Sequence, residues 1–189
     1  NAVKESHYRI AAALLNNGYK IPGKKITINM APAALKKEGA AYDLTLALGI
    51  LVASAQLQAP DIGQYIMMGE LSLDGSILAV KGVLAMAIQA VEEGFKGLIV
   101  PAENALEASV VRGIQVFGVS HINEVIDFVS SKNKQQTLAP VSEISLSNTP
   151  ASNPSIHLTT IYQINLTLPK EVAIIRYITA IFTAHKDHE

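Results

Sequence analysis

The stretch GELSLDGSILAVKGVLAMAIQAVEEGFKGLIVPAENA, from Gly69 to Ala105, decides the fold class. Asp74-Gly75 stands between two apolar runs, and this dipeptide is a strong signal for a tight hairpin turn. The sequence therefore predicts one strand over residues 65–71, a turn, and a second strand over residues 76–80.

Beyond the hairpin, the same stretch alternates between helix and strand. Apolar residues at helical spacing predict a helix over residues 83–93, closed by Gly94. Leu98-Ile99-Val100 predicts a short buried strand that stops at Pro101, and a short helix is expected from about Ala105.

Outward from this stretch the alternation continues in both directions. Downstream, the pattern predicts a strand over residues 115–119 and a helix over residues 122–129. Upstream, it predicts a helix over residues 3–15 that ends at Asn17-Gly18 and a strand over residues 26–30. Alternating strands and helices of this kind predict an α/β (α+β) fold, a mixed sheet with helices packed on it.

A third helix, over residues 44–55, is apolar nearly all round, so it should lie deep in the domain. Asp43 is interpreted as its N-cap. The side chains expected to be almost fully buried are Leu44, Leu46, Ala47, Leu48, Ile50 and Leu51.

Composition divides the chain into three parts. Residues 1–130 form the expected domain, and residues 131–155 have the Ser, Asn, Thr and Pro content of a linker. Residues 156–189 form a tail in which 161–168 predicts a strand and 169–184 an amphipathic helix. We expect the tail strand to pair with an exposed sheet edge, in its own subunit or in a neighbour.

The bulk numbers exclude several classes of protein. The net charge is −1 over 189 residues, so the chain lacks the excess of basic residues that is typical of a domain that binds nucleic acid by itself. The absence of cysteine excludes disulfides, thiolate zinc sites and cysteine nucleophiles. No apolar run is long enough to span a bilayer, so we expect a cytoplasmic protein without membrane contact. The opening Asn1, in place of Met, indicates a cut fragment or a processed chain.

Two stretches carry a resemblance to a known family: ITINMAPAALKKEGAAYDLTLALGILVAS, residues 26–54, and the opening stretch, residues 69–105. Together they resemble the N-terminal domain of the bacterial magnesium-chelatase-subunit-I-related (ComM/YifB-type) AAA+ ATPases, and more distantly the proteolytic domain of Lon. The resemblance covers residues 1–130, while residues 156–189 match neither. It implies a Lon-protease-domain-like, or ribosomal-protein-domain-like, fold.

Lon-type proteases, which the chain resembles distantly, use a serine-lysine dyad. Their serine lies in a Lys-Asp-Gly-Pro-Ser-Ala-Gly loop, and their lysine follows a Gly-Gly-Leu run. The resemblance places Ala41 at the serine position and Leu84 at the lysine position. Neither side chain supplies a nucleophile or a base, so we expect no protease activity from this dyad.

Four charged residues are candidate binding residues: Lys36, Lys37, Glu38 and Lys81. The first three lie on the loop that holds the nucleophile in Lon, where they could contact nucleic acid or a neighbouring subunit; the alternative is a solvated loop. Glu38 and Asp43 could form a carboxylate pair for a metal, but capping explains Asp43 better. The scattered histidines offer no three-ligand set, so no metal site is assigned.

Three functions remain open at this point. The first is a non-catalytic accessory domain of a magnesium-chelatase-like AAA+ ATPase, which assists assembly or engages a partner or DNA in DNA processing. The second is a Lon-like hydrolase with a displaced nucleophile, Ser72 or Ser76. The third is a free-standing interaction module. The chain has no phosphate-binding Gly-rich loop, so ATP and magnesium are implied only for full-length family members, and no cofactor is assigned to this chain.

Overall fold

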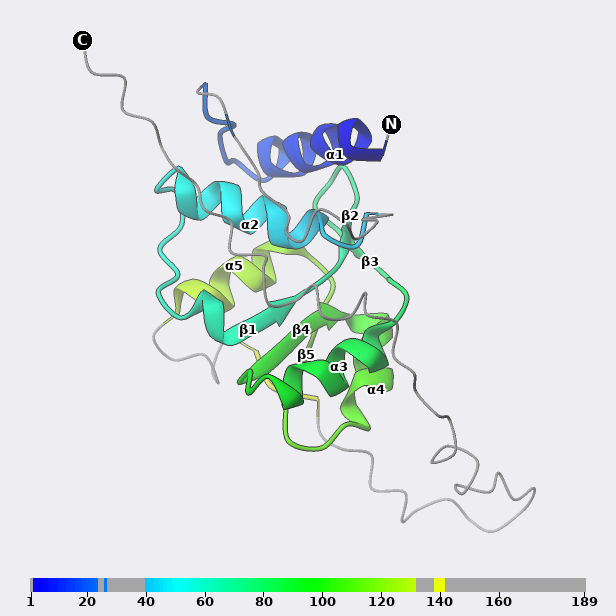
Figure 1. Cartoon of the computed structure of the whole chain (residues 1–189). Coiled ribbons are helices and arrows are strands. Elements are labelled where there is room, and N and C mark those ends of the chain that lie inside the picture. Colours follow the sequence, from blue (N-terminus) through cyan, green and yellow to red (C-terminus); the bar gives the residue numbers. More distant parts are fainter. Residues whose placement is uncertain (1, 24–25, 27–39, 132–137, 142–189) are drawn as a thin grey trace.

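The computed structural model describes residues 2–23, 26, 40–131 and 138–141. At its centre is a parallel sheet of three strands in the order β1-β4-β5, with helices on both faces (Figure 1). These strands are β1 (Tyr65–Met67), β4 (Gly97–Pro101) and β5 (Gln115–Val119), and a 3-10 turn, η1 (Ile62–Gln64), leads into β1. The predicted α/β class, with helices packed on the sheet, is confirmed.

The sheet divides the apolar residues into two cores because successive side chains of a strand point to opposite faces. On β1, Tyr65 and Met67 belong to the first core, whereas Ile66 belongs to the second. The central strand, β4, is buried at all five positions, as expected for a parallel strand covered on both sides.

The first face is covered by α1 (Ala2–Asn16), α2 (Asp43–Ala53) and α5 (Ile122–Ser130). α1 packs on α2, so this face carries two layers of helix (Figure 1). All six α2 residues that the sequence predicts to be buried are so. Against α5, the rings of Tyr65, Phe117 and Phe128 form an aromatic cluster, in which the Phe117 and Phe128 centroids lie 4.7 Å apart.

The second face is covered by α3 (Val83–Glu92) and α4 (Ala102–Ser109). Small residues bring α4 close to the sheet: a Cβ on Gly118 of β5 would lie 2.9 Å from the Ala105 Cβ. The prediction that this helix begins at about Ala105 is wrong by one turn. Pro101 occupies the N-cap position, and the helix starts directly after it because proline is tolerated at a helix start.

The predicted hairpin is confirmed as β2 (Glu70–Leu71) and β3 (Ile77–Leu78), with Gly75 at φ +96° in the turn. The prediction of one continuous strand over residues 65–71 is wrong. The Gly69 N–H donates to the Ala41 carbonyl at 2.9 Å, and its carbonyl accepts from the Leu44 N–H at 3.1 Å. The backbone N–H and carbonyl of Gly69 therefore bond to the start of α2 and not to another strand. At Gly69 the chain leaves the parallel sheet and enters the hairpin.

The hairpin is joined to the parallel sheet at the end of β5. An antiparallel bridge links Ser76 to His121, and the Ile77 N–H donates to the Ser120 carbonyl at 2.8 Å. Parallel and antiparallel pairing are thus both present.

The remaining helix ends follow the sequence closely. α1 stops at Gly18 (φ +83°) and α3 at Gly94 (φ +75°), and both glycines adopt the left-handed conformation that favours this residue. The predicted strand over residues 26–30 lies outside the described residues apart from Ile26, and the tail over residues 156–189 lies wholly outside them.

Part of the predicted linker is packed against the domain. The Val141 N–H donates to the Val116 carbonyl of β5 at 2.7 Å, and the Val141 side chain packs against the second core. Leu138 packs against the first core. Residues 138–141 therefore lie at the outer edge of β5.

Candidate functional site

Ala41, which the resemblance places at the position of the Lon serine, lies two residues before α2 and is half-buried. Its carbonyl accepts the Gly69 N–H, which fixes the backbone at this point. Its methyl group packs against the second core. The structure thus keeps a well-defined position here, with no hydroxyl on it.

Leu84, at the position of the Lon lysine, is the second residue of α3 and is half-buried. Its backbone N–H donates to the Glu107 Oε1 of α4 at 3.2 Å. The preceding Val83 belongs to the second core, against which Ala41 also packs. Ala41 thus packs against the core to which the residue before Leu84 belongs, and the Glu107 carboxylate accepts from the backbone at Leu84.

Lys81 lies between β3 and α3, and its side chain is exposed. The backbone next to it is fixed by the Asn104 side chain, which accepts from the Val80 N–H at 2.9 Å and donates to the Val80 carbonyl at 3.0 Å. Within the described part of the chain, Lys81 forms no ion pair. The other three candidate binding residues, Lys36, Lys37 and Glu38, lie outside the described residues.

A buried charged cluster joins α1 to the start of α2. Asp43 is fully buried and accepts hydrogen bonds from the Ser6 hydroxyl and from the Arg9 Nε, the latter at 2.8 Å. The hydrogen bond to Asp43 raises the pKa of Arg9 above its ordinary value, and the nearby charge of Glu70 adds to this shift.

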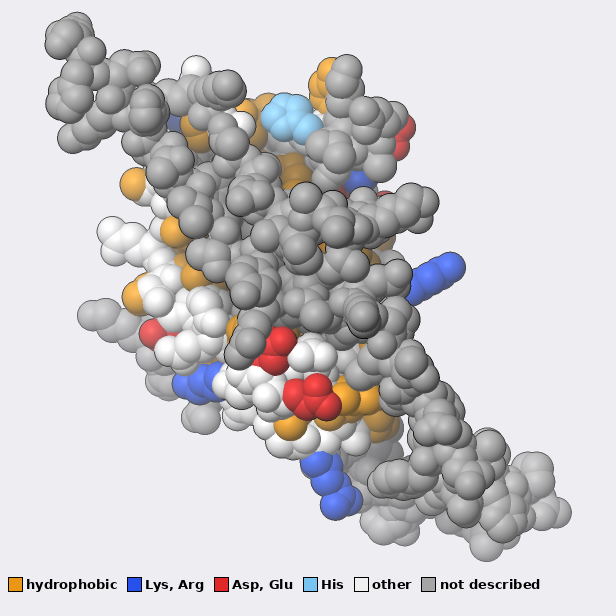
Figure 2. Space-filling view, viewed as in Figure 1, with side chains coloured by type: hydrophobic (Ala, Val, Ile, Leu, Met, Phe, Trp, Pro, Cys, Tyr) orange, Lys and Arg blue, Asp and Glu red, His pale blue; other side chains and the backbone are white. Residues whose placement is uncertain are grey.

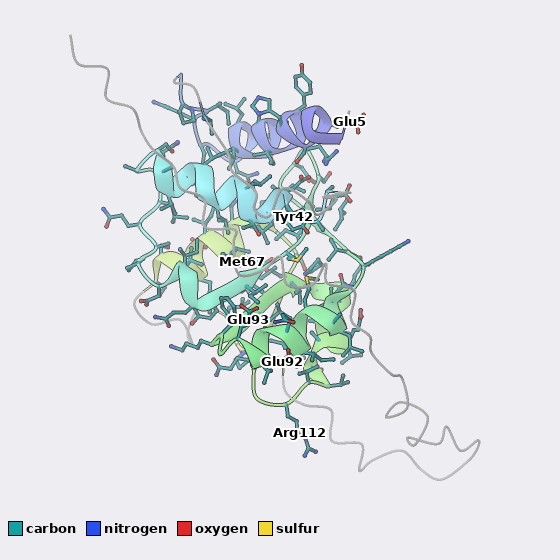
Figure 3. All side chains as sticks on the ribbon, in the orientation of Figure 1. Glu5, Tyr42, Met67, Glu92, Glu93 and Arg112 are labelled. Carbon is teal, nitrogen blue, oxygen red and sulfur yellow. The ribbon has the colours of Figure 1, made fainter. Side chains whose placement is uncertain are left out.

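The interpretation of Asp43 as the N-cap of α2 is wrong. Tyr42 occupies the cap position without a side-chain cap, and Asp43 turns its carboxylate to α1 instead. Because a fully buried carboxylate needs a compensating charge, Asp43 pairs with the Arg9 guanidinium. Tyr42 lies at the head of α2 (Figure 3), where burial raises the pKa of its phenol.

The hydroxyls considered as displaced nucleophiles, Ser72 and Ser76, both bond to Asp74. The backbone N–H and the hydroxyl of Ser76 donate to the Asp74 carboxylate at 2.9 and 3.0 Å, and these bonds lower the pKa of Asp74. His121 lies opposite Ser76 in the antiparallel bridge. Its Nδ1 accepts from the Asn123 N–H and its Nε2 bonds the Asp74 carbonyl, each at 3.2 Å. Neither serine is hydrogen bonded to a histidine or lysine among the residues that the structure places.

Two further features bear on the kind of site. Over the described ranges, no group of three His, Asp or Glu side chains could hold a metal ion. In the same ranges, none of the helices has the length and apolar content needed to cross a membrane.

Comparison with known proteins agrees with this geometry. Residues 1–104 match the family described as "Subunit ChlI of Mg-chelatase". The uncharacterized protein YifB of Salmonella typhimurium is 41% identical over 131 residues, which cover 69% of this chain and 26% of the relative. The competence protein ComM of Haemophilus influenzae is 40% identical over 132 residues, or 70% of this chain and 26% of ComM. The chain thus spans about a quarter of the length of these relatives.

The similarity to Lon is weaker. The Lon protease of Halothermothrix orenii is 31% identical over 107 residues, which cover 54% of this chain and 13% of that protease. The match to the chelatase-subunit family covers more than half of the 189 residues. This chain therefore belongs to the Mg-chelatase subunit ChlI family, as a relative of the ComM and YifB proteins.

Proposed function

We propose that this chain is a non-catalytic accessory domain of a magnesium-chelatase-like AAA+ ATPase, which assists assembly or the engagement of DNA or another partner in DNA processing. One observation carries the proposal. The two positions that a Lon-type dyad needs are held firmly by the fold, and they carry Ala41 and Leu84. A scaffold can keep its fold while its chemistry is lost.

The surroundings of Leu84 support the same conclusion. A lysine that activates a nucleophile must be able to lose its proton. Leu84 supplies no such amine, and the Glu107 carboxylate is bonded to its backbone N–H.

The hydrolase alternative gains no support from Ser72 and Ser76. Both are engaged by Asp74, whose lowered pKa keeps it an acceptor, and the His121 Nδ1 is occupied by the Asn123 N–H. A serine nucleophile needs a base within hydrogen-bonding reach, and neither hydroxyl has a histidine or lysine in that role in the described structure.

The role in DNA processing rests on the similarity to ComM, whose name marks it as a competence protein. The net charge of −1 favours an indirect role, in which other parts of a full-length protein hold the nucleic acid. ATP and magnesium would likewise belong to an ATPase module outside this chain.

A domain exchange tests the proposal. In the ComM protein of Haemophilus influenzae, the region of 132 matched residues would be replaced by the corresponding part of this chain, or deleted. We expect the exchanged protein to retain ATP hydrolysis and transformation, and the deletion variant to lose transformation. A deletion variant that transforms as well as intact ComM would contradict an accessory role.

A further inference from the structure

The outward face of α4 combines exposed apolar and acidic side chains. Leu106 is 54% exposed and Val110, directly after the helix, is 66% exposed. Glu103 and Glu107 are also exposed and lie on the same side, because residues three and four apart are neighbours on a helix.

The described chain ends beside this helix. Val141 is bonded to β5 at Val116, and its side chain approaches Gly118. Gly118 in turn lies against Ala102 and Ala105 of α4. Whatever follows Val141 therefore starts from the flank of α4.

The sequence that follows contains a segment of matching chemistry. Residues 169–184, PKEVAIIRYITAIFTA, place Val172, Ile175, Ile178 and Phe182 at helical spacing. Lys170 and Arg176 give this segment two positive charges against one negative charge. An amphipathic helix of this kind fits an apolar groove or face flanked by acidic residues.

The connection between the two is long enough. Residues 142–168 separate Val141 from the segment, and a chain of this length without regular structure would have a root-mean-square span of about 30 Å. This span is comparable to the diameter of a small domain. Tethering at this length also raises the effective concentration of the segment at α4.

We propose that residues 169–184 dock as an amphipathic helix on the outward face of α4, which we call the α4 face: Glu103, Leu106, Glu107 and Val110. The apolar stripe of the segment covers Leu106 and Val110, and its basic residues lie toward Glu103 and Glu107. The inference concerns the tail of this chain and is independent of the proposed accessory function.

The absence of cysteine allows a direct test in the full chain. Spin labels would be attached at Arg112→Cys, which projects from the body just after α4 (Figure 3), and at Thr179→Cys in the segment. Pulsed electron paramagnetic resonance would then measure the distance between the labels. We expect a short, narrow distance distribution that survives dilution with excess unlabelled protein.

Two double variants provide the matched comparison. Leu106→Ser with Val110→Ser changes the α4 face, and Tyr8→Ser with Leu15→Ser makes an equivalent change on α1, where these residues are 71% and 57% exposed. We expect the narrow component to be lost in the first variant and kept in the second, with unchanged circular dichroism in both. A broad distribution in the parent chain, equal effects of the two variants, or loss of the short distance on dilution, which indicates a second copy, would each overturn the proposal.

Discussion

The two faces of the central sheet are built differently, although the same three strands supply both. The first face is covered by two layers, with α1 over α2, and encloses the Arg9–Asp43 ion pair. The second face is covered by one layer of helix, α3 and α4, and Leu106 and Val110 of this layer are exposed. Ala41 packs against the core of this side, and Leu84 lies in α3, which covers it. We infer that the first face, with its two layers of helix, contributes more to the stability of the fold than the second.

The largest expected effect comes from opening a cavity in the first face. Leu48 is fully buried in α2, so Leu48→Ala should lower the free energy of unfolding by about 2–5 kcal/mol. The matched truncation on the second face, Leu106→Ala, removes a side chain that is 54% exposed and should lower it by about 1 kcal/mol or less, even with the tail docked on it. Urea unfolding followed by circular dichroism measures both, and similar losses would contradict the contrast between the faces.

The buried ion pair gives the next largest effect. Arg9→Ala leaves the Asp43 carboxylate buried without its cation and should cost about 3 kcal/mol in the free energy of unfolding. Adding Asp43→Asn removes the unpaired charge, so the double variant should be more stable than Arg9→Ala alone. If the second substitution instead added a further full loss, the pair would not be coupled as the structure indicates.

The hairpin provides the smallest effect, and it depends on pH. Hydrogen bonds from the Ser76 backbone and side chain lower the pKa of Asp74. The folded chain therefore binds fewer protons at Asp74 than the unfolded chain does. The stabilisation is present above the unfolded pKa and is lost as the pH falls below about 4 through the lower folded value. The difference in unfolding free energy between the parent chain and Asp74→Asn should therefore shrink from pH 6 to pH 3. A constant difference would show that Asp74 does not titrate differently on folding.

Local sequence patterns predicted the elements that depend on local causes. The all-apolar run from Leu44 to Leu51 can only be buried, and Gly75 and Gly94 mark a turn and a helix end through their positive φ. The features that sequence reasoning missed depend on distant partners. Nothing near Gly69 indicates that its backbone groups bond to Ala41 and Leu44, about 25 residues earlier in the chain.

The candidate site shows the same limit. The resemblance placed Ala41 and Leu84 at the dyad positions, and the structure places Ala41 against the second core and Leu84 in α3, one residue after the core residue Val83. The Arg9–Asp43 pair was missed because its members are 34 residues apart. The sequence did offer one signal: Asp43 is a single carboxylate at the start of an all-apolar helix. Such a carboxylate is expected to be buried, and a buried charge requires a partner. No local pattern predicted the hydrogen bond between Glu107 and the Leu84 N–H, because the two residues are 23 positions apart.

The central claim is that this chain has no protease activity, and labelling with a serine-reactive fluorophosphonate during incubation with unfolded casein tests it most directly. The account predicts neither casein turnover nor covalent labelling, because Ala41 and Leu84 occupy the dyad positions and Asp74 engages Ser72 and Ser76. Turnover or labelling that disappears in Ser72→Ala or Ser76→Ala would contradict it and establish a displaced nucleophile.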